Sequence, residues 1–349
     1  MKAWVLEDIG NIKYKEVLKP QISENEVLVQ VKAAGICGSD IPRIYQTGAH
    51  QMPLIPGHEF SGQVVQTGEN ADVKWQNKRV GIFALIPCHN CVACQKGQYE
   101  LCRNYSYLGS RRDGGFAEYV AVPECNLIEL PENVSYEEAA MLEPMSVACH
   151  ALRRVKASSS DTVAVCGLGT IGMFIVMLLL ERNVKNLLVI GNKAFQKEKI
   201  LRLGIKEEQY CDSKCENAES WLDKKTGGIG ADVFFECVGK NETCSLAINH
   251  AAPGGKVCLV GNPYSDMLLD KQVYWKILRN QLTVTGTWNS SFTGEVTDDW
   301  HMIVHLLKEK KIDPAQFISH CYRLEELDRG FEIMRDKSED YIKIMAVME

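Results

Sequence analysis

The sequence has no excess of basic residues. Its 39 lysines and arginines are outnumbered by 45 aspartates and glutamates, which gives the 349 residues a net charge of −6. Nucleic acids and anionic membranes attract a positive field, so neither is expected as a partner. Proline/serine linkers, repeats and low-complexity tracts are missing too, and 46% hydrophobic with 24% charged residues excludes a disordered, collagen-like or coiled-coil chain. The length suits about two domains.

A secretory signal peptide is also not expected. Residues 1–8 already carry charge where a signal peptide needs an apolar core. Fourteen cysteines are too sparse for a small disulfide-stapled domain, so we expect a cytoplasmic protein in a reducing compartment. One charge-free stretch, residues 162–180, approaches the length of a membrane span, but it contains three glycines, Gly167, Gly169 and Gly172. A buried strand, a tight turn and a buried helix explain it better.

Two hydrophobic patterns occur in different parts of the chain. Residues 26–32 and 60–65 have the two-residue period of strands, which predicts a β-rich first domain. Later, apolar runs each precede a segment of helical length, and these runs lie at residues 162–166, 186–190, 232–237, 256–260 and 282–285. Such alternation predicts an α/β domain with a doubly wound parallel sheet. A helix at 298–310 and a strand at 341–347 follow, and we expect this tail to pack onto the first domain.

Four closely spaced cysteines predict a metal site. Cys88, Cys91, Cys94 and Cys102 follow the pattern C-x2-C-x2-C-x7-C. One folded loop can bring four thiolates with this spacing around a tetrahedral zinc at about 2.3 Å each, with no position left for substrate. The expected zinc is therefore structural. An iron–sulfur cluster and independent buried thiols are the alternatives.

A second set of ligand residues predicts an open metal site. Cys37 and His58 each lie beside glycines, where a tight backbone lets a side chain project into a cleft, and Glu143 supplies a carboxylate. One thiolate, one imidazole and one carboxylate neutralise a dication and leave a fourth position for water or substrate, as a catalytic zinc requires. Taken one at a time, the three residues are equally explained as a core cysteine, a core histidine and a helix-end acid.

A glycine fingerprint predicts dinucleotide binding. The strand at 162–166 leads into Gly167, Gly169, Thr170, Ile171 and Gly172, and then into a long apolar helix. Glycines at these places let a pyrophosphate approach the backbone at the helix N-terminus, where amide groups favour negative charge. The alternative is a tight strand-to-helix turn that binds nothing.

The next strand ends without the acidic residue that holds the ribose hydroxyls of NAD. Gly191, Asn192 and Lys193 stand at that place, and Lys197 and Lys199 follow. With no carboxylate to repel a 2′-phosphate and with lysines to pair with it, NADP is favoured over NAD. The alternative is that these lysines form a solvated helix face and NAD is held more loosely.

Motifs along nearly the whole chain resemble the zinc-dependent medium-chain dehydrogenases. They occur in the family's order, at residues 57–59, the four-cysteine lobe, residues 113–119, Glu143-Pro144 and the glycine fingerprint. Residues 143–150 look like the polyol dehydrogenase branch. Residues 37–44 and 109–115 are most similar to its polyol-phosphate dehydrogenases.

This resemblance implies a domain organisation and a ligand set. A GroES-like catalytic domain would comprise residues 1–150 and 287–349, with a Rossmann domain of residues 151–286 inserted. Residues matching Cys37, His58 and Glu143 hold the catalytic zinc in the family, and the one matching Glu59 can enter or leave its coordination shell. The chain would then carry two zinc ions, one catalytic and one structural, in a homodimer or homotetramer.

The chain departs from the family pattern where many relatives carry a proton-relay histidine. Pro42 stands at that place, so Ser39 would pass the proton to water or to the cofactor ribose. A phosphorylated substrate also needs a cationic anchor, for which Arg43, Arg111 and Arg112 are candidates. Arginines paired with acids between domains or at the surface are the alternative.

Three functions compete at this point. The first is oxidation of a polyol phosphate to a ketose phosphate, in which zinc stabilises the alkoxide and hydride moves to the nicotinamide. The second uses the same chemistry on free polyols, as sorbitol dehydrogenases do, or on simple secondary alcohols. The third is a nicotinamide-binding sensor or quinone-reductase-like protein without the catalytic metal. The presence of Cys37, His58 and Glu143 speaks against the third.

Overall fold

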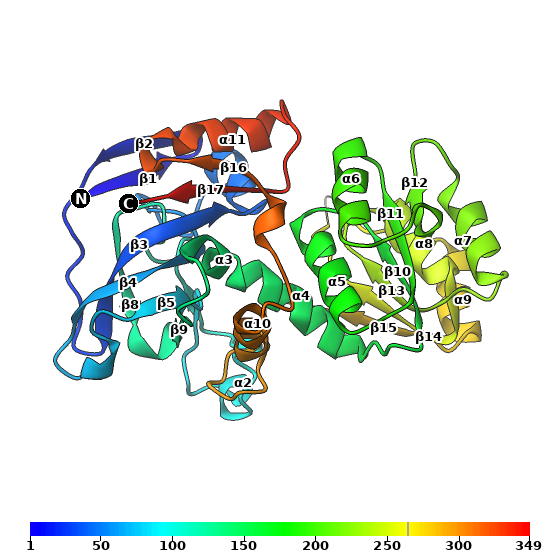
Figure 1. Ribbon diagram of the computed structural model, residues 1–349, viewed down its shortest axis with the longest axis horizontal. Helices are drawn as coiled ribbons and strands as arrows, with labels where there is room; N and C mark the ends of the chain where they lie inside the picture. The colour runs from blue at the N-terminus through cyan, green and yellow to red at the C-terminus, as the bar shows by residue number, and fades with distance from the viewer. Residues whose placement is uncertain (264) are drawn as a thin grey trace. The chain divides into compact units, whose positions relative to one another are not determined.

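Two units make up the chain in the computed structural model, which describes residues 1–263 and 265–349. Unit 1 contains Met1–Pro144 and Ser290–Glu349, and unit 2 contains Met145–Asn289. The ribbon diagram labels their elements, and each unit is described by itself (Figure 1).

Unit 1 is built around a seven-stranded, mainly antiparallel sheet. Its strand order is β16-β17-β3-β4-β5-β9, and β8 also pairs with β3. Two further pairs, β1-β2 and β6-β7, are antiparallel. The strands are β1 (Lys2–Asp8), β2 (Asn11–Glu16), β3 (Glu26–Ile36), β4 (Glu59–Thr67), β5 (Arg79–Ile82), β6 (Leu85–Ile86), β7 (Ser106–Tyr107), β8 (Tyr119–Pro123), β9 (Leu127–Glu129), β16 (Ile318–Tyr322) and β17 (Lys343–Val347).

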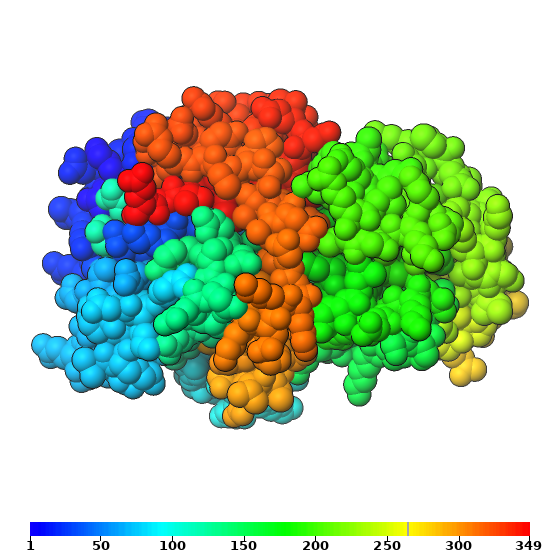
Figure 2. All heavy atoms as spheres, viewed as in Figure 1, coloured from blue at the N-terminus to red at the C-terminus, as the bar shows by residue number. Residues whose placement is uncertain are grey.

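The C-terminal strand β17 completes this sheet. It pairs antiparallel with the second half of β3, and Ile344 lies opposite Ile36. The buried side chains of β3 pack with Phe60 of β4 and with Phe331 of the C-terminal segment in one apolar core. Figure 2 shows the C-terminal residues in orange and red against the blue N-terminal ones. The tail therefore packs onto the first domain, as predicted, because its apolar strand β17 pairs with β3.

Short helices and turns connect the strands of unit 1. Ser135 caps α3 and forms a capping box with Glu138, which satisfies amide groups at the start of that helix. The helices are α1 (Asp40–Pro42), α2 (Val92–Gln95), α3 (Tyr136–Ala140), α4 (Leu142–Val155, which continues into unit 2), α10 (Asp299–Lys308) and α11 (Leu327–Asp336). Single turns of other helix types are η1 (Arg43–Thr47), η2 (Val73–Trp75), η3 (Tyr99–Leu101), η4 (Glu124–Asn126), η6 (Ala315–Phe317) and η7 (Leu324–Glu326).

Unit 2 is a parallel six-stranded sheet of order β12-β11-β10-β13-β14-β15. Figure 1 shows α5 and α6 on one side of its strands and α7, α8 and α9 on the other. This is the doubly wound arrangement of dinucleotide-binding folds, so the predicted fold class is confirmed. The elements are β10 (Thr162–Cys166), α5 (Thr170–Glu181), β11 (Asn186–Gly191), α6 (Ala194–Arg202), η5 (Glu207–Gln209), β12 (Tyr210–Asp212), α7 (Ala218–Thr226), β13 (Ala231–Glu236), α8 (Asn241–Asn249), β14 (Ala251–Leu259), α9 (Lys271–Arg279) and β15 (Thr283–Gly286).

The long charge-free stretch is a strand, a turn and a helix. It forms β10 and α5, and eight residues of α5 are buried inside unit 2. Among the described residues, no helix is both long enough and apolar enough to cross a bilayer. Edge strand β12 was not predicted, because three residues are too few to show a period.

Candidate metal centres and active site

The four cysteines of the lobe after β6 lie together. Each offers a sulfur within 4.8 Å of the others. The Sγ atoms of Cys91 and Cys94 are 3.6 Å apart, those of Cys91 and Cys102 are 3.9 Å apart, and those of Cys88 and Cys94 are 4.0 Å apart. Four sulfurs at about 2.3 Å from a tetrahedral zinc are about 3.8 Å from one another. The lobe therefore fits a zinc ion with no open position.

The protonation tendencies of these thiols also suit metal binding. Hydrogen bonds from the backbone amides of Cys94 and Arg103 lower the pKa of Cys91 to about 6, which favours its thiolate. Burial raises the pKa of Cys94 to about 12. A bound cation would stabilise the second thiolate, since metal ligation requires the deprotonated sulfur.

A second cluster forms where β3 ends and β4 begins. Cys37 directly follows β3, and His58 directly precedes β4. The antiparallel register places Gly35 opposite Glu59, so the two strand ends meet. Cys37, His58 and Glu59 each offer a ligand atom within 4.8 Å of the others. The pairing of β3 with β4 thus brings together residues that are about 20 positions apart in the sequence.

Asp40 contacts this cluster through its carboxylate. It is fully buried, accepts a 2.9 Å hydrogen bond from the Cys37 amide and a 2.6 Å bond from Arg43, and lies 3.4 Å from His58 Nδ1. Burial opposes the charge of His58, but Asp40 and the Cys37 thiolate outweigh it and raise the pKa of His58 well above its ordinary value. Burial likewise opposes the charge of Asp40, yet His58 and Arg43 keep its pKa low.

Lys343 is a member of the site that sequence reasoning missed. Its ammonium group on β17 forms an ion pair with Glu59 and donates a 3.1 Å hydrogen bond to the carbonyl of Ile36. The side chains of Lys343 and Glu59 are each 1% exposed. The sequence held one signal, a lysine inside an otherwise apolar strand, but nothing to identify its partner.

Glu143 lies at the start of α4, outside the tight cluster of three ligand atoms. Its Oε1 accepts a 3.2 Å hydrogen bond from the Tyr107 hydroxyl, and the Tyr107 ring meets the His58 ring edge-on at 5.8 Å. Burial raises the pKa of Glu143 to about 7, the charge of Glu59 adds to this effect, and His58 and Lys343 oppose it. Glu143 is thus close enough to His58, Glu59 and Lys343 for their charges to shift its pKa.

Ser39 completes the cluster on the side of Cys37. Its hydroxyl lies 3.4 Å from the Cys37 sulfur and donates to it. Pro42, which stands where many relatives have a histidine, lies in the short helix α1. The hydroxyl of Ser39 therefore lies beside the thiol of this cluster.

The glycine fingerprint adopts the turn between β10 and α5. Gly167 has a φ of +99°, and a Cβ atom on Gly172 would lie 1.9 Å from the carbonyl oxygen of Gly167. Only glycine fits such an approach of helix to turn. Gly169 precedes the first helical residues Thr170 and Ile171, so the helix begins where a pyrophosphate would be received.

Gly191 stands where an acidic residue would hold the ribose of NAD, and neighbouring side chains lie close to this position. A Cβ atom on Gly191 would lie 2.8 Å from the Leu168 side chain and 2.8 Å from the Tyr210 hydroxyl. Asn192 follows β11, and Lys193 precedes α6 with its ammonium group 5.5 Å from the Phe195 ring centre. Lys197 is paired with Glu207 at 2.7 Å.

The three candidate arginines have different surroundings. Arg43 is paired with Asp40 at 2.6 Å, and Arg112 with Glu26 at 2.5 Å. Arg111 instead places its guanidinium group 4.5 Å from the centre of the Tyr105 ring.

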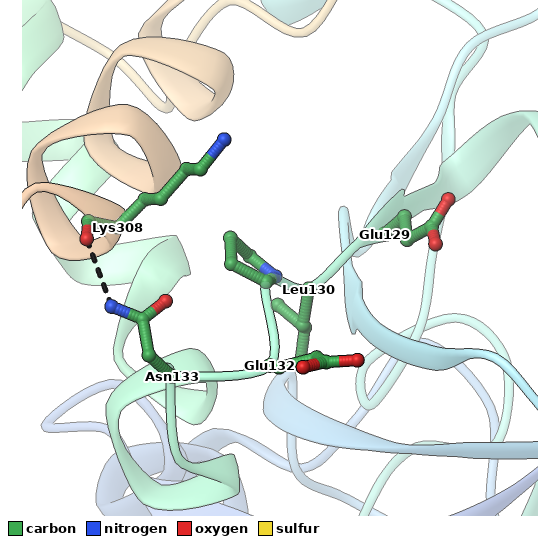
Figure 3. A pocket seen from close by; sticks show the side chains of 6 residues that line it. Glu129, Leu130, Glu132, Asn133 and Lys308 are labelled. Carbon is green, nitrogen blue, oxygen red and sulfur yellow. Dashed lines mark hydrogen bonds between the residues drawn. The ribbon is translucent and has the colours of Figure 1, made fainter.

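A surface hollow on unit 1 does not include any of these residues (Figure 3). In it, the Asn133 side-chain amide donates a 2.8 Å hydrogen bond to the carbonyl of Lys308. Its lining residues are Glu129, Leu130, Pro131, Glu132, Asn133 and Lys308. Neither thiols nor imidazoles line it, so the candidate chemistry lies with the two cysteine-containing clusters.

Two family models match the chain. The "Alcohol dehydrogenase GroES-like domain" matches residues 23–132, and "Zinc-binding dehydrogenase" matches residues 170–309. Galactitol 1-phosphate 5-dehydrogenase of Escherichia coli (strain K12) is 33% identical and covers 92% of this chain and 92% of its own. Sorbitol dehydrogenase of Arabidopsis thaliana is 29% identical over 99% of this chain and 94% of its own.

Solved structures agree with the sequence relatives. Galactitol-1-phosphate dehydrogenase from Escherichia coli superposes with a TM-score of 0.92 at 30% identity, covering 100% of both chains. A putative zinc-binding dehydrogenase from Sinorhizobium meliloti 1021, solved bound to NADP, gives 0.90 at 27% identity over 99% of both chains. The chain therefore belongs to the zinc-dependent medium-chain alcohol and polyol dehydrogenases, oxidoreductases that act on CH–OH groups.

Proposed function

We propose that the protein oxidises a phosphorylated polyol, galactitol 1-phosphate or a close relative, to the ketose phosphate, which for galactitol 1-phosphate is tagatose 6-phosphate. One observation carries this proposal: the Cys37 thiol, the His58 imidazole and the Glu59 carboxylate converge within 4.8 Å, with the Ser39 hydroxyl 3.4 Å from the thiol. That arrangement suits activation of an alcohol by a metal ion and removal of its proton. The similarity to galactitol 1-phosphate 5-dehydrogenase supports the phosphorylated substrate.

The residues of the second cluster fit a catalytic zinc. Cys37, His58 and Glu143 would hold it, and Glu59, which is paired with Lys343, lies close enough to join them. When bound, zinc lowers the pKa of the substrate hydroxyl, and the nicotinamide accepts the hydride. With the four-cysteine lobe, the proposed content is two zinc ions in each chain.

The chain's own residues orient the ligands and move the proton. Asp40, fixed by Arg43, holds the imidazole of His58 in place, and the Tyr107 hydroxyl holds Glu143. Ser39 accepts the proton of the substrate hydroxyl at its Oγ and passes it to water or to the cofactor ribose.

We favour NADP as the cofactor, with NAD as the alternative. Leu168 and Tyr210 occupy the space that an acidic side chain at Gly191 would need. Gly191 itself carries no carboxylate that would repel a 2′-phosphate, and Lys193 follows two residues later, although Asp212 of the neighbouring strand β12 lies opposite Gly191. The solved relative bound to NADP supports this choice.

Catalysis and dinucleotide binding would belong to different domains. Residues 1–150 and 287–349 would form the catalytic domain, and residues 151–286 would bind the dinucleotide at Gly167, Gly169 and Gly172. The doubly wound sheet of unit 2 supports this assignment, because such sheets bind dinucleotides at the first strand-to-helix turn.

Oxidation of free polyols or simple secondary alcohols is the second candidate. The similarity to sorbitol dehydrogenase favours it, and the same zinc ligands would serve. The two candidates differ only in whether the far end of the substrate carries a phosphate.

A homodimer or homotetramer in the cytoplasm is the proposed state. The sheet of unit 2 ends at β15, whose outer edge has no partner strand among the described residues. Val284 of β15 is exposed, and so are Trp275 and Leu278 of α9, the helix that precedes β15 in the chain. A second copy pairing by two-fold symmetry would cover an open strand edge and apolar side chains together. Thiolate metal ligands favour a reducing compartment.

Activity assays and metal analysis test the proposal. We expect reduction of ketose phosphates to exceed that of the matching free ketoses, with NADPH preferred to NADH, and two zinc ions per chain by elemental analysis. Equal rates on phosphorylated and free ketoses would favour the second candidate. One zinc per chain and no turnover with any ketose would reject the enzyme assignment.

A further inference from the structure

We propose that Arg111 is the anchor for the phosphate group of the substrate. This inference rests on the proposed function, since it assigns the far end of the same substrate. Its basis is the environment that separates Arg111 from the two other candidate arginines.

Arg43 and Arg112 are already committed to carboxylates. Arg43 pairs with Asp40, which in turn contacts His58, so its charge maintains the metal ligands. Arg112 pairs with Glu26 at the start of β3, the end of that strand opposite to Cys37. Neutralised guanidinium groups offer little attraction to a phosphate.

Arg111 has no such partner in the part of the chain that the structure describes. Its Nε is buried and makes no hydrogen bond, and its guanidinium group forms no ion pair with a described carboxylate. A buried donor without an acceptor is costly, and a guanidinium group matches two phosphate oxygens at once. A bound phosphate would pair with the guanidinium charge, which no described carboxylate neutralises.

Two tyrosine rings lead from Arg111 to the metal cluster. The guanidinium group lies over Tyr105, the Tyr105 and Tyr107 rings meet edge-on at 6.2 Å, and the Tyr107 ring meets His58 at 5.8 Å. The backbone amide of Arg111 also donates a 2.8 Å hydrogen bond to the Tyr107 carbonyl. The arginine is therefore held on the same hydrogen-bonded turn as Tyr107, which contacts both His58 and Glu143.

The size of the substrate suits this separation. Six bonds join the reacting carbon of a hexitol 1-phosphate to its phosphorus, and an extended chain of six bonds spans about 7 Å, or two residue lengths. Added to the contacts at either end, this is of the same order as the two ring-to-ring steps between His58 and Tyr105. The hydroxyl end would lie at the metal ligands while the phosphate lies over the Tyr105 ring edge.

Arg111→Met tests the assignment in the zinc-loaded enzyme. Loss of a charge-assisted bidentate contact should raise KM for tagatose 6-phosphate about 10- to 100-fold and change KM for free tagatose far less. Arg111→Lys should recover part of the loss, since it keeps the charge but not the fork. The matched control is Glu26→Gln with Arg112→Met, which removes the neighbouring arginine together with its partner and should leave the ratio of the two KM values unchanged.

Inorganic phosphate supplies a readout that does not depend on turnover. It should bind the wild-type enzyme in a calorimetric titration and bind Arg111→Met at least tenfold more weakly, with zinc content and circular dichroism unchanged. A wild-type enzyme that prefers phosphorylated ketoses, together with an unchanged preference and phosphate affinity in Arg111→Met, would overturn this inference and leave the proposed function intact. A wild-type enzyme without that preference would overturn both.

Discussion

Replacing Lys343 by methionine should destabilise the protein strongly when zinc is absent and much less when zinc is bound. The substitution keeps an unbranched side chain in β17 but removes the ammonium group that faces Glu59. It leaves a buried carboxylate whose remaining neighbours include the Cys37 thiol and Glu143, both of which are negative when ionised.

The magnitude follows from the burial of the pair. Lys343 and Glu59 are each 1% exposed, and breaking such a buried ion pair by removing one partner typically costs about 3–5 kcal/mol. A bound dication would compensate part of the lost positive charge, since Glu59 lies within 4.8 Å of the Cys37 and His58 ligand atoms. By the thermodynamic cycle that links folding and binding, a smaller cost in the loaded protein means that Lys343→Met binds the catalytic zinc more tightly.

Urea unfolding at pH 8, where carboxylates are ionised, measures both arms of this cycle. Wild type and Lys343→Met are compared after chelation and after zinc reconstitution, and Glu59→Gln with Lys343→Met serves as the control that removes both charges. The control should recover most of the lost stability in the chelated protein. A loss below about 1 kcal/mol in the chelated single variant, or weaker zinc binding by it, would refute the reasoning.

Three further outcomes are expected. Gly172→Ala should abolish NADPH binding in a fluorescence titration while zinc content stays at the wild-type value, because its Cβ would lie 1.9 Å from the Gly167 carbonyl oxygen; normal binding would show that the helix can shift. Cys94→Ser should remove one zinc per chain and lower the melting temperature, and unchanged metal content would contradict a structural site. Burial opposes the charge of Glu26, but Ser23 and Arg112 hold its pKa below the ordinary value. The stabilisation from this group is therefore complete above about pH 4.3, its pKa when unfolded, and is lost as the pH falls through the lower folded value. The melting temperature of Glu26→Gln should accordingly fall less than that of wild type between pH 6 and pH 3.

The local parts of this protein could be predicted from its sequence. The lobe with Cys88, Cys91, Cys94 and Cys102 needs only one short loop, so spacing alone indicated the metal geometry. The strands of unit 2 were predicted because each is an apolar run, and β12 was missed because it has three residues. A strand can be recognised from its sequence only when it is long enough to show an apolar run or an alternating pattern.

Contacts between distant segments could not be predicted in the same way. Lys343 and Glu59 are 284 positions apart, and their pairing depends on β17 and β4 both flanking β3. The register of these strands decides which side chains face one another, and one residue of slip would reverse every orientation. The three candidate arginines likewise differ little in sequence, and only their partners distinguish them.

The charges around the second cluster argue for a divalent ion on grounds independent of the family. Asp40 and Arg43 cancel each other, as do Glu59 and Lys343. Cys37, His58 and Glu143 then remain; burial raises the pKa of Glu143 to about 7, and, against the opposing effect of burial, the charge of Asp40 helps to raise the pKa of His58 well above its ordinary value. A dication bound here would favour the ionised carboxylate of Glu143 and would take the imidazole of His58 as a neutral ligand in place of its proton. The fourth position would then be the one place in the cluster where an alcohol oxygen could share the ion's charge, which is the requirement for the proposed oxidation.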